Sequence, residues 1–191
     1  MFIDFLTLVM INMIAATILL LFYLWKGMDE KDQRPYAAIF FMTGLLSFVT
    51  GLQISFTWPL PGSFNVVYGD AITLFGVVFL ATSIALWQGW SLLPVAIYSF
   101  FAGLDAIIGG IRLYSLNLGS GVYEVVAAGF ILTGLGGVSA FPFLQWFKNN
   151  KTVRSIAMVV LLVAAVIWFI VFCNAIWVHM ATFANYVPVA K

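Results

Sequence analysis

Residues 155–181 read SIAMVVLLVAAVIWFIVFCNAIWVHMA, a run that contains no charged side chain. About 20 helical residues cross the hydrocarbon core of a bilayer, so this run is long enough to span a membrane. The whole chain has the same character, because 64% of its 191 residues are hydrophobic and only 8% are charged. A soluble domain carries about a quarter of charged residues. We therefore predict an all-α integral membrane protein whose main partner is the lipid bilayer.

Six apolar stretches of this kind follow one another and predict a bundle of six transmembrane helices in a single membrane domain, residues 1–191. The predicted spans are residues 3–25, 36–58, 71–88, 91–114, 122–147 and 155–181. The third and fourth spans are divided at residues 88–91, because together they are too long for one crossing. Pro142 should kink the fifth span or end its regular part.

Basic residues gather in two of the predicted connections and give the bundle a direction. They are Lys26, Lys31 and Arg34 after the first span, and Lys148, Lys151 and Arg154 after the fifth. The positive-inside rule places both connections in the cytoplasm, and both termini then lie on the non-cytoplasmic side. Tyrosines and tryptophans cluster near both predicted interfaces, as this arrangement requires. Of the seven tryptophans, only Trp168 falls in the middle of a span.

The second predicted span carries a series of polar side chains at roughly helical spacing. They are Thr43, Ser47, Thr50, Gln53 and Thr57. This spacing (i, i+4, i+7, i+10, i+14) predicts that they share one face of the helix, and a continuous polar face cannot meet lipid without a large cost. It faces either another helix through hydrogen bonds or a path that water can enter, and the sequence leaves both interpretations open.

Ionisable residues near the outer end of the fourth and fifth spans form a second polar feature. Asp105 and Arg112 are seven residues apart, which is two helical turns on one face, and Glu124 begins the next span. One interpretation makes them a polar station along a solute path, because charges within a membrane are often functional. The other makes them a charge cluster that locks helix ends.

Small residues repeat every four positions at Gly129, Thr133 and Gly137, a spacing that lets helices approach closely. The contact is either within the chain or between subunits. A Thr-Gly-Leu triplet at 43–45, 50–52 and 133–135 would correspond in an inverted three-plus-three repeat.

Motifs for catalysis, metals and nucleic acids are absent from the sequence. There is no glycine-rich phosphate loop and no His-Glu-x-x-His, and the single Cys173 and His179 cannot build a paired site. The net charge of +1 does not indicate a nucleic-acid partner. We therefore predict that the protein is not an enzyme and uses no metal or other cofactor.

Two resemblances add to this picture. The stretch 55–62, SFTWPLPG, followed by Tyr68-Gly69-Asp70, resembles a prokaryotic six-span membrane family, domain of unknown function 981, over the whole chain. This resemblance implies a place in the prokaryotic cell (plasma) membrane and implies no activity.

A second resemblance, to the urea/amide channel family, covers about fifty residues of the third and fourth spans. It rests on Tyr68-Gly69, Phe75-Gly76, Phe79-Leu80-Ala81, Gly89-Trp90 and Tyr98-Ser99-Phe100. The resemblance implies a homo-oligomer, a hexameric ring with one pore in each subunit, narrowed by Phe75 and Phe79. The family's tandem tryptophans in the fifth span are missing, and Thr133 falls near their place. Its acidic residue in the last span is also missing, near Val160, which argues against urea as the solute.

These features together favour a channel or facilitator for a small polar solute. Phe75 and Phe79 would form the constriction, the second span and Thr133 the polar wall, and Asp105, Arg112 and Glu124 the outer station. The alternative is a non-catalytic membrane subunit of a larger complex, for example a respiratory one. A lipid-modifying enzyme is the third interpretation, and no acid/base constellation supports it.

Overall fold

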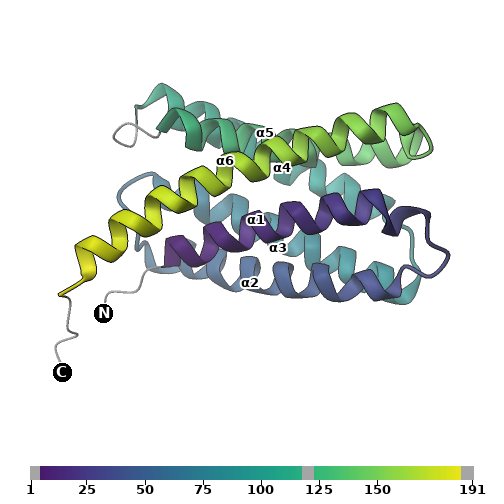
Figure 1. Ribbon diagram of the computed structural model, residues 1–191, viewed down its shortest axis with the longest axis horizontal. Coiled ribbons are helices and arrows are strands. Elements are labelled where there is room, and N and C mark those ends of the chain that lie inside the picture. Colours follow the sequence, from purple (N-terminus) through teal and green to yellow (C-terminus); the bar gives the residue numbers. More distant parts are fainter. Residues whose placement is uncertain (1–4, 118–122, 186–191) are drawn as a thin grey trace.

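Six long helices run alternately up and down in the computed structural model, which describes residues 5–117 and 123–185 (Figure 1). They are α1 (Phe5–Trp25), α2 (Ala37–Thr57), α3 (Phe64–Gln88), α4 (Leu93–Ser115), α5 (Tyr123–Pro142) and α6 (Lys151–Phe183). Each contains a stretch that is long and apolar enough to cross a membrane. The prediction of an all-α membrane protein with six spans is therefore confirmed.

The turn between α3 and α4 divides the two helices where the sequence predicted. Gly89 adopts a left-handed conformation with φ of 71°, which glycine reaches without a steric penalty. The Trp90 amide then donates a hydrogen bond to the Ala85 carbonyl at 2.8 Å and closes the end of α3. The reversal is tight because only four residues separate Gln88 from Leu93.

The predicted start of the third span, residue 71, is wrong, because α3 begins at Phe64. The fully buried Asn65 accepts a hydrogen bond from the Leu60 amide at 2.7 Å and donates to the carbonyls of Leu60 and Gly62. One side chain thus holds the whole preceding turn against the helix. The connection from α2 shrinks to residues 58–63, and none of them lines the cavity described below.

The ends of α5 and α6 also depend on single residues. The α-helical part of α5 ends at Pro142, as predicted, and a π-helical turn, Phe143–Phe147, continues it. The last helix begins at Lys151 and not at residue 155, because Asn150 accepts hydrogen bonds from the amides of Thr152 and Val153. Two short 3-10 helices, Gly27–Asp29 and Arg34–Tyr36, connect α1 to α2.

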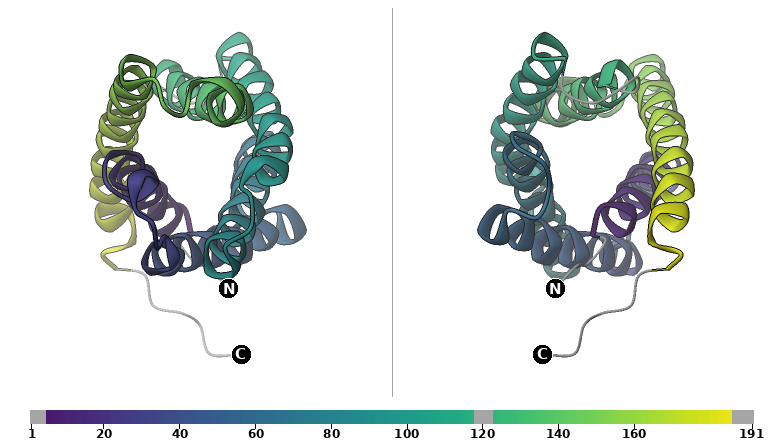
Figure 2. Two further views of the ribbon diagram at one scale, coloured as in Figure 1. Left: turned by 90° about the vertical axis from the view of Figure 1, so that its right-hand side faces the viewer. Right: turned by 90° about the vertical axis from the view of Figure 1, so that its left-hand side faces the viewer.

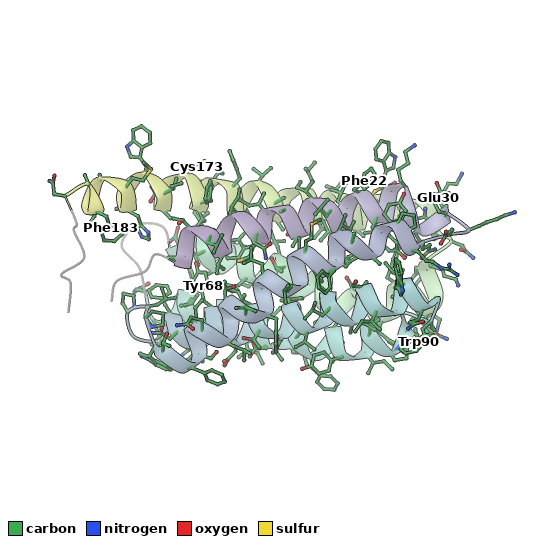
Figure 3. All side chains as sticks on the ribbon, turned by 90° about the horizontal axis from the view of Figure 1, so that it is seen from below. Phe22, Glu30, Tyr68, Trp90, Cys173 and Phe183 are labelled. Atoms are coloured by element: carbon green, nitrogen blue, oxygen red, sulfur yellow. The ribbon has the colours of Figure 1, made fainter. Side chains whose placement is uncertain are left out.

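The helices form a ring in chain order, as the end views in Figure 2 show. Each helix packs against its neighbours in the sequence, and α6 packs against α1 to close the ring. The start of α1 and the end of α6 lie at one end, here called the terminal end. The opposite end carries the turns 26–36, 89–92 and 148–150 and is called the basic end; Glu30 and Trp90 mark it in Figure 3.

Two neighbouring pairs, α2/α3 and α4/α5, approach so closely that their backbones touch. A Cβ atom on Gly76 would lie 2.5 Å from the Phe48 amide nitrogen, and one on Gly103 would lie 2.5 Å from the Gly134 carbonyl oxygen. A Cβ on Gly137 would likewise meet Gly103 at 2.9 Å, so this small residue packs within the chain. An inverted three-plus-three repeat would relate α2/α3 to α5/α6, where Gly129 faces the Trp168 side chain instead of a backbone. Helix packing therefore does not follow that repeat.

Candidate binding cavity

A cavity of about 530 Å³ lies inside the ring, in the half of the molecule nearer the basic end. All six helices contribute to its wall. The wall extends from Met13 and Trp168 near the middle of the ring to Met28, Leu92 and Phe147 close to the basic end. Its volume falls within the range of about 300–1,000 Å³ that is typical of small-molecule sites.

The wall of the cavity is mostly apolar, and the described residues that form it include no Asp, Glu, Lys, Arg or His. Hydroxyl groups supply most of its polarity, and several already donate to backbone carbonyls. Thr17 donates to the Met13 carbonyl, Thr82 to that of Val78, and Thr133 to that of Gly129, each at 2.8 Å. A polar guest would lose its hydration there and find few hydrogen-bond partners in exchange, which is unfavourable. The wall is therefore suited to an apolar or weakly polar molecule.

Phe75 and Phe79 both lie on this wall, one helical turn apart on α3. The Phe79 ring meets the Phe40 ring edge-on, with 5.5 Å between centroids. Phe75 packs against the buried cluster of the terminal half. The structure thus brings the two predicted constriction residues to the interior of the ring, together with Ser47 and Thr133.

Three aromatic rings fill the interior on the terminal side of the cavity. Phe130 meets Tyr68 edge-on at 4.9 Å between centroids and meets Trp168 edge-on at 5.1 Å. The Trp168 indole donates a hydrogen bond to the Thr133 hydroxyl at 3.0 Å, which satisfies its buried N–H. Tyr68 is labelled in Figure 3. We call Tyr68, Phe130 and Trp168 the aromatic plug, because their side chains fill the interior of the ring between α3, α5 and α6.

The polar series of α2 divides into two groups in the structure. Thr43, Ser47 and Thr50 are buried, and of these three only Ser47 lines the cavity. The Thr43 and Thr50 hydroxyls donate to carbonyls of their own helix. From α1, Asn12 donates hydrogen bonds to the Thr43 carbonyl at 3.0 Å and to the Ser47 hydroxyl at 2.8 Å. Hydrogen bonding between helices, one of the two open interpretations, therefore accounts for Ser47. Sequence reasoning missed Asn12, although an amide side chain inside an apolar span was a usable signal.

The assignment of Gln53 and Thr57 to the same inner wall is wrong, because both side chains are exposed on the outside of the ring. An α-helix turns about 100° per residue, so positions 53 and 57 trail Thr43 by about 80° and 40°. Thr57 donates to the Gln53 carbonyl at 2.7 Å, which satisfies its hydroxyl locally.

Asp105, Arg112 and Glu124, the predicted outer station, do not line this cavity, and their role as a station stays a prediction. Asp105 is half-buried and lies within electrostatic range of Asp70 on α3. Arg112 is exposed and donates to the Ser115 hydroxyl at 3.2 Å. Among the described residues, ion pairs join Arg34 to Asp32 and Arg154 to Asp29, so Arg112 makes no such bond to Asp105 or Glu124.

An ion pair at the basic end ties the first connection to α6. Arg154 donates to the two Asp29 carboxylate oxygens at 2.5 and 2.9 Å, and also to the Lys148 carbonyl. The Arg154 side chain is only 12% exposed. Its guanidinium, through these hydrogen bonds, holds the pKa of the Asp29 carboxyl below its usual value.

The ring and its cavity define a six-span α-helical membrane protein with an apolar cavity inside a single chain. The chain belongs to the family described as protein of unknown function (DUF981), which it matches over residues 1–182. Neither the curated proteins nor the solved structures contain a match to the chain. In the described ranges 5–117 and 123–185, no three His, Cys, Asp or Glu side chains are grouped as a metal site would need.

Proposed function

We propose that the protein moves a small solute of low polarity across the membrane through the interior of each subunit. The observation that carries this proposal is the cavity of about 530 Å³ with an uncharged wall, enclosed by six helices in ring order. No charged group or metal cluster is needed for passive movement along such a path. The same space therefore serves a facilitator better than it serves a catalyst.

The low polarity of the proposed solute follows from the lack of free hydrogen-bond partners on the cavity wall. Moving an amide or hydroxyl group from water into surroundings without a hydrogen-bond partner costs about 2–7 kcal/mol. The rings of Phe75, Phe79 and Phe40 offer no hydrogen-bond partner to such a group. The hydroxyls of Thr82 and Thr133 already donate to backbone carbonyls. We therefore replace the small polar solute expected from the sequence with a neutral, weakly polar or apolar one.

Passage through the ring requires the aromatic plug to move. Tyr68 and Trp168 are fully enclosed in the resting arrangement, and Phe130 lies between them. Phe75 and Phe79 would then select solutes by width on the cavity side of the plug.

The orientation of the protein in the membrane and its oligomeric state belong to the same proposal. The positive-inside rule places the basic end in the cytoplasm of a prokaryotic cell, with both termini outside. Homo-oligomers are proposed as well, with six copies suggested by the resemblance to the urea/amide channels. Each subunit would keep its own path, because the cavity lies within one chain.

Stopped-flow swelling of proteoliposomes tests the proposal with a graded series of neutral solutes, from urea and glycerol to butyramide and short alcohols. We expect permeation above that of empty vesicles for the less polar members. Phe79→Ala should extend the range to wider solutes. If no solute permeates faster than in empty vesicles, the proposal fails. A stoichiometric foreign subunit that co-purifies in mild detergent would support the alternative of a subunit in a larger membrane complex.

A further inference from the structure

The wall of the cavity reaches the outer surface of the ring at one place. Four of its residues are exposed: Leu135, Ser139 and Phe147 on α5 and its π-helical extension, and Ile156 on α6. The wall residues contributed by α1 to α4 are all buried or half-buried. A residue that lines the cavity and also faces outward marks an edge of the wall. The cavity therefore continues to the outside between α5 and α6.

Small side chains border this gap. A Cβ on Gly129 would lie 3.0 Å from the Trp168 ring, whereas a Cβ on Gly136 would make only an ordinary contact with Leu161, at 3.6 Å. Beyond Gly136 the wall includes Ser139 and Ala140 on α5 and Ala157 on α6. Phe143 packs against Leu161 and Leu24 and bounds the gap on the basic side.

Contacts join the helices at each of the other boundaries. The backbones of α2/α3 and α4/α5 touch through glycines, and Asn12 bridges α1 to α2. Between α3 and α4, a Cβ on Gly109 would lie 2.9 Å from the Val67 side chain. At the closing boundary, the Asp29–Arg154 pair links the chain after α1 to α6. Only the α5/α6 boundary thus shows an edge of the cavity among the described residues.

The gap lies at membrane depth and is surrounded by apolar surface. Leu135, Ser139 and Ile156 are inside the two apolar segments, 124–147 and 151–183, that are long enough to span the bilayer. Val159 and Leu162, next to the gap on α6, are exposed hydrophobic side chains. In a membrane this region contacts hydrocarbon chains, because water does not reach it.

We propose that the cavity is entered sideways from the bilayer through the α5/α6 gap, and that its occupant is the hydrocarbon chain of a lipid-soluble amphiphile. The proposal rests on the function proposed above and names its solute class and its route. An uncharged wall of aliphatic and aromatic side chains matches such a chain. A flexible chain also passes a narrow gap more easily than a rigid, hydrated solute does.

Photolabelling tests the proposal on the intact protein. The protein is reconstituted in phosphatidylcholine vesicles that contain a palmitic acid analogue with a diazirine in its chain, and labelled residues are mapped by mass spectrometry. Val78 is buried on the cavity wall, whereas Ile84, on the same helix, faces outward. We expect label on Val78 comparable to that on Ile84. Label on Ile84 without label on Val78 would overturn the proposal.

Two matched variants identify the route. Ile156 and Val159 are both 59% exposed on α6, but only Ile156 lines the cavity. Ile156→Trp should fill the gap and lower the Val78 label about tenfold, as a loss of about 1.4 kcal/mol in affinity would. Val159→Trp should leave it unchanged. Unchanged labelling in Ile156→Trp, or an equal loss in both variants, would show that the gap is not the entrance.

The two proposals fail separately. Label on Val78 that depends on Ile156, combined with no solute permeation in the swelling assay, would reject the transport function and leave an amphiphile-binding cavity. Permeation of water-borne solutes without label on Val78 would reject the lateral route and leave the facilitator.

Discussion

The terminal half and the basic half of the ring are built from the same six helices, yet one is filled and the other is hollow. The largest buried cluster, which includes the aromatic plug, belongs to the terminal half. The cavity wall combines small residues such as Ala96, Ser99 and Gly136 with large ones such as Phe40 and Phe79. Both sets of residues suit an apolar interior. Hydrophobicity along the chain therefore does not distinguish the filled half from the hollow one.

The two halves are also held together differently. In the terminal half, the plug rings meet at the centre and tie α3, α5 and α6 to one another. The hollow half has no such centre and depends on contacts between neighbouring helices. Two small clusters support it there, one around Tyr23 and Phe40 and one around Phe143 and Leu161. Substitutions should therefore have the largest effects in the plug and the smallest at the basic rim.

Removal of the Trp168 side chain should have the largest effect on stability, because it makes the packed terminal half hollow like the basic half. Trp168→Ala extends the hollow into the fully packed half and should lower the free energy of unfolding in detergent by about 3–5 kcal/mol. It should also raise solute permeation, because one ring of the plug is lost. Trp177→Ala is the matched control on the same helix, since Trp177 is 81% exposed and should change stability by less than about 0.5 kcal/mol. Equal losses in the two variants would contradict a packed plug.

Crowding a close helix pair should have the next largest effect. In Gly103→Ala, the new Cβ would lie 2.5 Å from backbone atoms of Gly134 and Val138, so α4 and α5 must separate. Overpacking of this kind costs about 1–3 kcal/mol. Gly136→Ala is the control, because its Cβ would meet only Leu161 at 3.6 Å and would gain the same helix propensity. Thermal unfolding should therefore rank Gly136→Ala well above Gly103→Ala.

The sequence was sufficient to predict the number of spans and those helix ends that a single residue determines. Gly89 and Pro142 ended their helices where expected, because glycine permits the left-handed turn and proline cannot continue the helical hydrogen bonding. The start of α3 was missed because hydropathy does not separate an apolar turn from an apolar helix. The hydrogen bonds of Asn65 that make this distinction depend on where the turn folds.

The cavity itself was less predictable than its wall residues. Phe75, Phe79, Ser47 and Thr133 were singled out and do reach the interior, and Trp168 stood out as the one tryptophan in the middle of a span. Tyr68 entered only through the two resemblances and without a role, and Phe130 carried no signal, since aromatic residues are common throughout the chain. The proposed α5/α6 gap depends on how two helices pack against each other. No pattern within a single helix reports that packing.

Loss of the Asn12 hydrogen bonds should lower the free energy of unfolding by a smaller amount. Asn12 lies near the boundary of the two halves, so this substitution tests how the halves are joined. Asn12→Leu keeps the volume of the side chain but removes the donors to Thr43 and Ser47. Hydrogen bonds between membrane helices contribute about 0.6 kcal/mol each on average and at most about 1.7. A double-mutant cycle with Ser47→Ala, measured by unfolding in detergent, should give a coupling energy in that range. Strict additivity would show that the contact does not stabilise the α1/α2 boundary.

The smallest effect is expected at the basic rim, where Asp29 and Arg154 join the chain after α1 to α6. Since Arg154 lowers the pKa of the Asp29 carboxyl, the folded state is favoured above the ordinary aspartate pKa, near about 4. That stabilisation is lost as the pH falls through the lowered folded-state pKa. The melting temperature of the wild type should therefore decrease more between pH 6 and pH 3 than that of Asp29→Asn.

Asp32→Asn is the control for this pH dependence, because Asp32 meets Arg34 at 3.8 Å with both side chains largely exposed. It should follow the wild type at every pH. A difference between wild type and Asp29→Asn that is independent of pH would mean that Asp29 acts through packing instead of charge. If the predicted pH dependence appears while the photolabel on Val78 is the same in Asp29→Asn and the wild type, the ion pair joins α1 to α6 without affecting the cavity. The hollow half would then owe its shape to its helix pairs alone, in contrast to the terminal half with its central plug.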